Sequence, residues 1–95
     1  MMDDEFEWDD AKAARNKRVH RIGFDKARRV FEDAFAYDWP ETSHVGPEQR
    51  RITVGMAGYT MLVVVYTHRS DRIRIISARR AGHHERKAYN DGHLA

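Results

Sequence analysis

The sequence predicts an α+β domain in which a small antiparallel β-sheet packs against α-helices, and two observations lead to this class. Apolar residues recur at helical spacing in the first half of the chain: Ala27, Val30, Phe31 and Ala34. Three later segments, residues 51–54, 61–67 and 72–76, alternate in polarity or are continuously apolar, and turn residues separate them. Strands that follow helices, rather than alternate with them, are typical of the α+β class.

The chain has room for one domain, residues 1–95, and we expect its core within about residues 6–90. Hydrophobic residues make up 41% and charged residues 34%, a ratio that favours a folded domain with a densely charged surface. Cysteine is absent, which is consistent with a cytoplasmic location. The longest apolar run, residues 61–66, is far shorter than the roughly 20 residues that cross a bilayer, so we expect no membrane association.

The first elements are predicted to be a short strand and two helices. Residues 6–8 alternate in polarity and precede Asp9, a suitable N-cap for a helix over about residues 11–19. Gly23 is expected to relax the backbone of the following linker. Asp25 is the expected N-cap of the second helix, whose apolar stripe should cover the sheet.

An edge strand and a central strand are predicted next. Residues 35–39 alternate loosely and stop at Pro40, which suits an edge strand followed by a polar loop at residues 41–47. The glycines of residues 55–58 indicate a hairpin turn. Residues 61–67 are apolar on both faces and should therefore form the central strand.

The last elements are a strand and a helix. Residues 68–71 turn into the strand at 72–76, and residues 78–80 lead off its end. Glu85, three residues after Gly82, forms half of a capping box, so we expect a final helix over about residues 83–90. The predicted order is β-α-α-β-β-β-β-α, with the helices on one face of the sheet.

Residues 72–80 combine alternating isoleucines with four arginines: Arg72, Arg74, Arg79 and Arg80. Such a strand has one buried face and presents guanidinium groups, which suit phosphate or carboxylate partners. In an unbroken strand Arg74 and Arg79 would point to opposite faces. Either a bulge or strand end near Ser77 turns Arg79 to the face of Arg74, or the two arginines have different roles.

A series of residues and short motifs, taken in order, spans nearly the whole chain. They are Phe6-Glu7-Trp8-Asp9, Lys12, Asn16, His20, Phe24, Ala27, Phe31-Glu32-Asp33, Glu48 with Arg50, Gly55, Val64-Val65-Tyr66-Thr67, Arg74-Ile75-Ile76-Ser77-Ala78-Arg79, and Glu85 with Tyr89. Together they resemble the BrnT toxins of bacterial type II toxin-antitoxin systems. The resemblance implies a RelE-like ribonuclease fold and RNA cleavage that arrests growth.

The resemblance also implies partners. A BrnA-like antitoxin with a ribbon-helix-helix DNA-binding domain would neutralise the toxin in a hetero-tetramer of two toxins and two antitoxins, and DNA would be contacted only through the antitoxin. Where the family usually reads Lys-His-Gly, this chain has Val19-His20-Arg21. The lost lysine motivates an alternative, a noncatalytic antitoxin-binding module that acts in transcriptional autorepression. A third reading, a general nucleic-acid binder, rests on the isoelectric point of about 9.2 and on the basic residues of the two leading helices.

RNA cleavage without a metal needs a base for the 2′-hydroxyl, cations for the phosphorane and an acid for the leaving 5′-oxygen. From the matched motifs we take seven candidates: Arg50, Arg74 and Arg79 as cations, His20 for proton transfer, Glu48 and Glu85 as alternative bases, and Tyr89 one helical turn from Glu85. Each has a structural alternative, since surface arginines and glutamates commonly pair and His20 suits a helix C-terminus. The histidines show no ligand spacing, so no metal or cofactor is expected.

Overall fold

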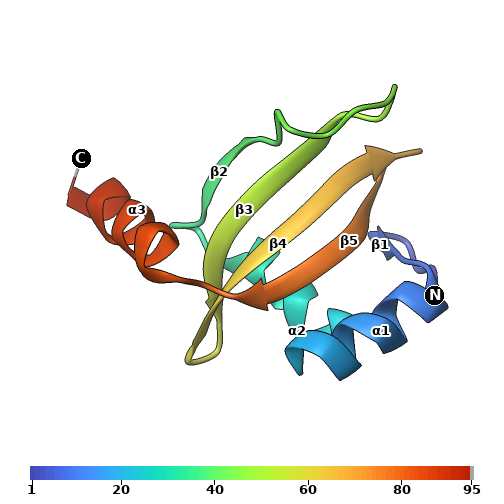
Figure 1. Cartoon of the computed structure of the whole chain (residues 1–95), viewed down its shortest axis with the longest axis horizontal. Coiled ribbons are helices and arrows are strands. Elements are labelled where there is room, and N and C mark those ends of the chain that lie inside the picture. The colour runs from blue at the N-terminus through green and yellow to red at the C-terminus, as the bar shows by residue number, and fades with distance from the viewer. Residues whose placement is uncertain (95) are drawn as a thin grey trace.

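The computed structural model describes residues 1–94 and the side chains of residues 1–92, which form one five-stranded sheet with flanking helices. The elements are β1 (Phe6–Glu7), α1 (Asp10–His20), α2 (Phe24–Ala27), the 3-10 helix η1 (Arg28–Glu32), β2 (Tyr37–Pro40), β3 (Arg50–Ala57), β4 (Thr60–Arg69), β5 (Arg72–Arg80) and α3 (His83–Leu94). The strand order is β1-β5-β4-β3-β2 (Figure 1). The predicted α+β class is confirmed. The sheet is mixed, because β1 joins β5 in parallel while the other pairs are antiparallel.

The first helix begins as predicted and ends differently. The Asp9 carboxylate accepts a hydrogen bond from the backbone N–H of Lys12 at 2.9 Å, which confirms the N-cap. The left-handed residue that ends α1 is Arg21, with φ of 62°, whereas Gly23 is extended and precedes α2. The roles predicted for Gly23 and Asp25 are therefore wrong. The backbone turns at Arg21 because the next residue, Ile22, is buried in the core.

The second helical segment covers the sheet but is shorter and tighter than predicted. α2 passes directly into η1, and the segment ends before Ala34, which is exposed. Val30 of η1 is fully buried and lies against β3 at Gly55. A Cβ at Gly55 would lie 2.9 Å from Cγ1 of Val30, so glycine permits this close approach.

The strands lie near the predicted places, but two bounds differ: β2 begins two residues later than expected and includes Pro40, and β5 continues through residues 78–80 instead of ending before them. β2 is an edge strand, and β4 is central and buried over most of residues 61–67. The turn between β3 and β4 is shorter than the predicted turn at residues 55–58. It consists of Gly58, with φ of 62°, and Tyr59, which connect the paired residues Ala57 and Thr60.

The two faces of the sheet differ. α1, α2 and η1 cover the first, here called the helix face, with a buried cluster: Phe6, Ile22, Phe24, Ala27, Val30, Ala57, Leu62, Val64, Ile75 and Ala78. The second, here called the open face, is covered at one end by α3 through Val54, Met61, Val63, Ala81 and Tyr89 (Figure 1). The expectation that all helices share one face is wrong for α3, because Val54 and Val63 point away from the helix-face cluster and bury Tyr89.

A bulge in β5 decides where its arginines point. The register with β4 shifts between Val65 and Tyr66, so Ile76 has no partner. After the bulge, Ala78 shares the helix face with Ile75. Arg79 then lies on the open face, like Arg74. This confirms the predicted alternative in which a bulge near Ser77 turns Arg79 to the face of Arg74. No helix within residues 1–94 is both long enough and apolar enough to cross a membrane.

Candidate functional site

Helix α1 is fixed against the edge of β5 by the buried side chain of Asn16. Its Nδ2 donates to the carbonyl oxygen of Ala78 at 2.8 Å, and its Oδ1 accepts from the N–H of Ala78 at 3.1 Å. The same Nδ2 donates to the carbonyl oxygen of Ile22 at 2.9 Å. Asn16 therefore continues the hydrogen bonding of β5 beyond β1 and holds the second half of α1 beside the bulge.

A concavity of about 280 Å³ lies at this junction. Its lining residues are Lys12, Arg15, Asn16, Val19, His20, Arg50, Ile76 and Ser77, and we call it the α1 cavity. It contains no carboxylate, and neither Lys12 nor Arg15 has an ion-pair partner among the described residues. Three cations and an imidazole around a small hollow create a positive potential that suits a phosphate group.

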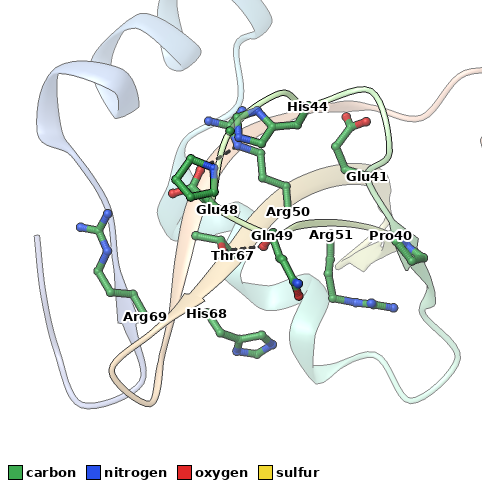
Figure 2. A pocket seen from close by; sticks show the side chains of 12 residues that line it. Pro40, Glu41, His44, Glu48, Gln49, Arg50, Arg51, Thr67, His68 and Arg69 are labelled. Carbon is green, nitrogen blue, oxygen red and sulfur yellow. Dashed lines mark hydrogen bonds and ion pairs between the residues drawn. The ribbon is translucent and has the colours of Figure 1, made fainter.

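Arg50 borders a second, larger hollow of about 780 Å³, the loop cavity, between residues 41–49 and the ends of β3 and β4 (Figure 2). Its Nε lies 2.8 Å from Oε1 of Glu48, and this hydrogen bond holds the pKa of Glu48 below its ordinary value. Glu48 lines the loop cavity and His20 the α1 cavity, while Arg50 lines both. The fold thus brings three of the predicted site residues to one place.

Other residues of these hollows were missed from the sequence. His44 and Arg69 line the loop cavity, and the Oγ1 of Thr67 donates to the carbonyl oxygen of Gln49 at 2.7 Å, tying the loop to β4 (Figure 2). A histidine in a polar loop and an arginine before a turn carry no pattern that marks a site. Lys12 and Arg15 could have been identified from the sequence, since two basic residues three positions apart lie on one face of a helix.

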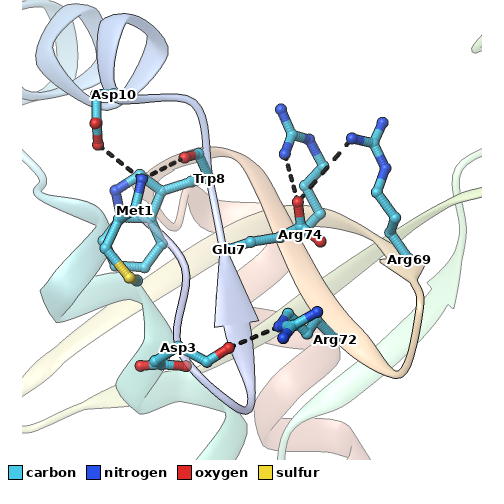
Figure 3. A network of polar contacts seen from close by, with 8 residues as sticks. All are labelled: Met1, Asp3, Glu7, Trp8, Asp10, Arg69, Arg72 and Arg74. Carbon is cyan, nitrogen blue, oxygen red and sulfur yellow. Dashed lines mark hydrogen bonds and ion pairs between the residues drawn. The ribbon is translucent and has the colours of Figure 1, made fainter.

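Arg74 is held by a buried carboxylate. Its Nη1 lies 2.7 Å from Oε2 of Glu7, whose side chain is 5% exposed, and Nη1 of Arg69 lies 4.0 Å from the same oxygen (Figure 3). Arg50, Thr67 and Arg74 are direct neighbours on β3, β4 and β5. Because strands lie about 4.8 Å apart, the two arginine backbones are roughly 10 Å apart on the open face.

The remaining predicted residues gather at α3, apart from both cavities. Arg79 Nη1 lies 3.0 Å from Oε1 of Glu85, which also accepts the N–H of Gly82 at 2.7 Å. These two bonds, that of Arg79 first, lower the pKa of Glu85. Glu85 therefore caps α3 as predicted.

Tyr89 connects α3 to the loop between η1 and β2. Its hydroxyl donates to Oδ2 of Asp33 at 2.8 Å, and the same oxygen accepts the N–H of Met56 at 2.8 Å. Burial, followed by this bond, raises the pKa of Tyr89 to about 12. The observed contacts of Arg79, Glu85 and Tyr89 position α3, and their part in catalysis stays a prediction.

Metal ligands do not gather in the described part of the chain: no group there of three or more His, Asp or Glu side chains is placed to hold a metal ion. The family model described as the ribonuclease toxin BrnT of type II toxin-antitoxin systems matches residues 8–85. The matched segment contains α1, strands β2 to β5 and every residue that lines the α1 and loop cavities. No match was found among curated proteins.

Proposed function

The chain belongs to the BrnT family of ribonuclease toxins of type II toxin-antitoxin systems, and we propose that it is an endoribonuclease that cleaves RNA without a metal ion and thereby arrests growth. One observation supports this mechanism most directly. Arg50 lies between two cavities that place a histidine, His20, on one side and a carboxylate, Glu48, on the other. In-line attack on a phosphate needs a proton acceptor and a proton donor on opposite sides of the phosphorus.

The proposed roles follow from charge. Arg50 binds two oxygens of the scissile phosphate and neutralises the charge that develops on the phosphorane. Glu48 accepts the proton of the 2′-hydroxyl as that oxygen attacks phosphorus, and its hydrogen bond with Nε of Arg50 fixes its carboxylate beside the phosphate-binding guanidinium. His20 donates a proton to the 5′-oxygen as the P–O bond breaks, which leaves a 2′,3′-cyclic phosphate and a free 5′-hydroxyl.

The neighbouring cations hold the substrate in place. Lys12 and Arg15 bind the phosphate next to the cleaved one. Arg74 binds a phosphate of the RNA further along the open face. Arg79, Glu85 and Tyr89 support this surface by positioning α3, and we assign them no proton transfer.

We further infer that the partner is a BrnA-like antitoxin with a ribbon-helix-helix DNA-binding domain. The family is one of type II systems, in which the toxin has a protein antitoxin and acts on RNA. We expect a hetero-tetramer of two toxins and two antitoxins in the cytoplasm, with DNA bound only through the antitoxin.

The decisive experiment incubates the purified protein with a long RNA in EDTA. We expect cleavage with cyclic-phosphate ends, slowed by about a hundredfold to a thousandfold in Arg50→Ala. Arg80→Ala is the matched control, because Arg80 is an exposed arginine on the opposite face of β5, and it should cleave at the wild-type rate. RNA that stays intact at high protein concentration, or that is cut only when magnesium is added, would contradict the proposal.

A second candidate function is a noncatalytic antitoxin-binding module that acts in autorepression. Val19 favours it: this residue lines the α1 cavity where the family usually has lysine, so the cavity has one cation fewer. Expression without the antitoxin separates the two candidates. Growth arrest that Arg50→Ala abolishes excludes the module, whereas normal growth together with a stable antitoxin complex supports it.

A further inference from the structure

An aromatic cavity lies between β2 and α3, apart from the two cavities at Arg50. Its volume is about 420 Å³, and Tyr37, Trp39, His84, Glu85 and Ala88 line it. The rings of Tyr37 and Trp39 are neighbours, with centroids 5.3 Å apart and planes inclined by 54°. Tyr37 is 44% exposed, although aromatic side chains are usually buried or paired in a core. Helix α3 passes close to the ring of Tyr37 at Gly92, and the rest of that ring remains exposed in the hollow as a flat apolar surface.

The aromatic cavity opens on the same face of the sheet as Arg50. Trp39 pairs with Ile52, and Tyr37 pairs with Val54, so both rings share the side of β3 that carries Arg50. Arg50 and Ile52 are two residues apart along β3, and Trp39 lies one strand away. The backbones of Arg50 and Trp39 are therefore roughly 8 Å apart, a separation comparable to that between a phosphate and the base of the next nucleotide.

The surface between the two sites is apolar and half-buried. Ile52 and Val65 are direct cross-strand neighbours, with Trp39 and Ser77 continuing the same row on either side. Both aliphatic side chains are partly exposed, while Val54 and Val63, one row further along, are buried beneath α3. A bound chain can thus pass from Arg50 to the aromatic cavity without crossing a charged barrier.

We propose that the aromatic cavity binds one unpaired nucleobase of the RNA whose scissile phosphate is held by Arg50, and that this selects single-stranded RNA. The inference rests on the proposed ribonuclease function and adds a binding site to it. Base stacking on aromatic side chains is the usual way in which proteins bind single strands. In a duplex the bases are paired and stacked within the helix, so none can enter the cavity.

Charge favours a nucleotide over a purely apolar occupant. His84 lines the aromatic cavity, and Arg79 forms an ion pair with Glu85 of its lining. Arg50 and Arg74 lie on the same face of the sheet, so the occupant should combine a flat ring with negative charge. Both hydrogen bonds of Glu85 go to its Oε1, and Oε2 accepts none within the described residues. That oxygen is available for an N–H group on the edge of a bound base.

Intrinsic fluorescence tests the cavity directly. Trp8→Phe leaves Trp39 as the single tryptophan, and a short RNA with 2′-O-methyl riboses binds but cannot be cleaved. We expect saturable quenching of Trp39 by the single strand and binding at least tenfold weaker for the duplex of the same sequence. Abasic replacements, one position at a time, should identify a single nucleotide whose base is needed.

Two tyrosines provide a matched pair of variants. Tyr37→Leu should weaken binding of the single strand by roughly five- to a hundredfold, because it removes a stacking surface. Tyr59→Leu should leave the affinity unchanged, since Tyr59 is fully exposed at the tip of the β3–β4 hairpin, outside the cavity. Equal thermal unfolding midpoints of the variants and the parent would show that the fold is retained.

Several outcomes would overturn the proposal. Equal binding of single strand and duplex would contradict the base site, and so would equal affinities of Tyr37→Leu and Tyr59→Leu. If the wild type still cleaved RNA, the ribonuclease function would stand without the base site. Quenching of Trp39 by an acidic peptide such as polyglutamate, without quenching by RNA, would assign the cavity to a protein partner. If the protein bound the single strand as expected but did not cleave RNA, the proposed ribonuclease function would be wrong and the base site would stand.

Discussion

The two faces of the sheet are built from the same strands and have opposite compositions. On the helix face, Leu62, Val64 and Ile75 are almost completely buried under α1, α2 and η1. On the open face, α3 covers one end only, and Ile52 and Val65 remain partly exposed between arginines and aromatic rings. The larger buried cluster lies on the helix face, and the open face keeps partly exposed surface that is available for binding.

Charged groups sharpen this difference. Each predicted arginine of the open face holds a carboxylate: Arg50 with Glu48, Arg74 with Glu7, and Arg79 with Glu85. These pairs fix the orientation of the guanidinium groups, which under the proposed function prepares them for a phosphate. The stability contributed by the more exposed pairs, such as Arg79 with Glu85, is small. We therefore expect substitutions on the open face to change activity and those on the helix face to change stability.

The largest effect is expected for His20→Gln at the α1 cavity. If His20 protonates the leaving oxygen, its loss should slow single-turnover cleavage by about a thousandfold, or roughly 4 kcal/mol in activation free energy. His83→Gln, at an exposed position on α3, is the control and should leave the rate unchanged. A variant of His20 that cleaves normally would show that the proton comes from elsewhere.

The next effect is on stability and concerns the helix face. Leu62→Ala should lower the free energy of unfolding by about 3 kcal/mol, because Leu62 is fully buried and a cavity remains. Urea denaturation measures this, and the cleavage rate of the folded fraction should be unchanged. Val65→Ala, on the open face of the same strand, is the control and should lose only about 1 kcal/mol. Equal losses of unfolding free energy in Leu62→Ala and Val65→Ala would show that the two faces do not differ in this way.

The smallest effect concerns the attachment of α3 through Tyr89. Tyr89→Phe removes the hydrogen bond to Asp33 and should cost about 1 kcal/mol at neutral pH. Since the folded pKa of Tyr89 is raised from 10.0 to about 12, this contribution is present below pH 10 and is lost as the pH rises toward 12. Chemical denaturation at pH 7 and pH 11 should therefore show a smaller difference between the variant and the wild type at the higher pH.

Tyr66 also contributes to the pH dependence of stability, and its contribution must be distinguished from that of Tyr89. Tyr66 donates to Oδ2 of Asp38 at 2.5 Å, and burial followed by this bond also raises its pKa to about 12. The wild type should consequently lose stability above pH 10 through both residues. Tyr59→Phe, at the exposed hairpin tip, is the matched control and should leave the stability at pH 7 unchanged. An alkaline stability profile that Tyr89→Phe does not alter would contradict the role given to its hydroxyl.

The sequence by itself determined the order of the elements, the N-cap at Asp9, the edge position of β2 and the central position of β4. These features depend on local polarity patterns and on turn residues, which can be read along the chain. The motifs also identified the family, which the match over residues 8–85 confirmed. The first group of conclusions needed only neighbours in the sequence, and the family needed the order of motifs along the chain.

The tertiary structure alone decided where the functional groups meet. The unpaired Ile76 puts Arg74 and Arg79 on one face, and the pairing of Asn16 with Ala78 brings His20 beside Arg50. α3 lies on the open face because Tyr89 buries against Val54 and Val63 there. Bulges, edge hydrogen bonds and helix docking depend on contacts between residues distant in the chain, so a periodic pattern cannot reveal them.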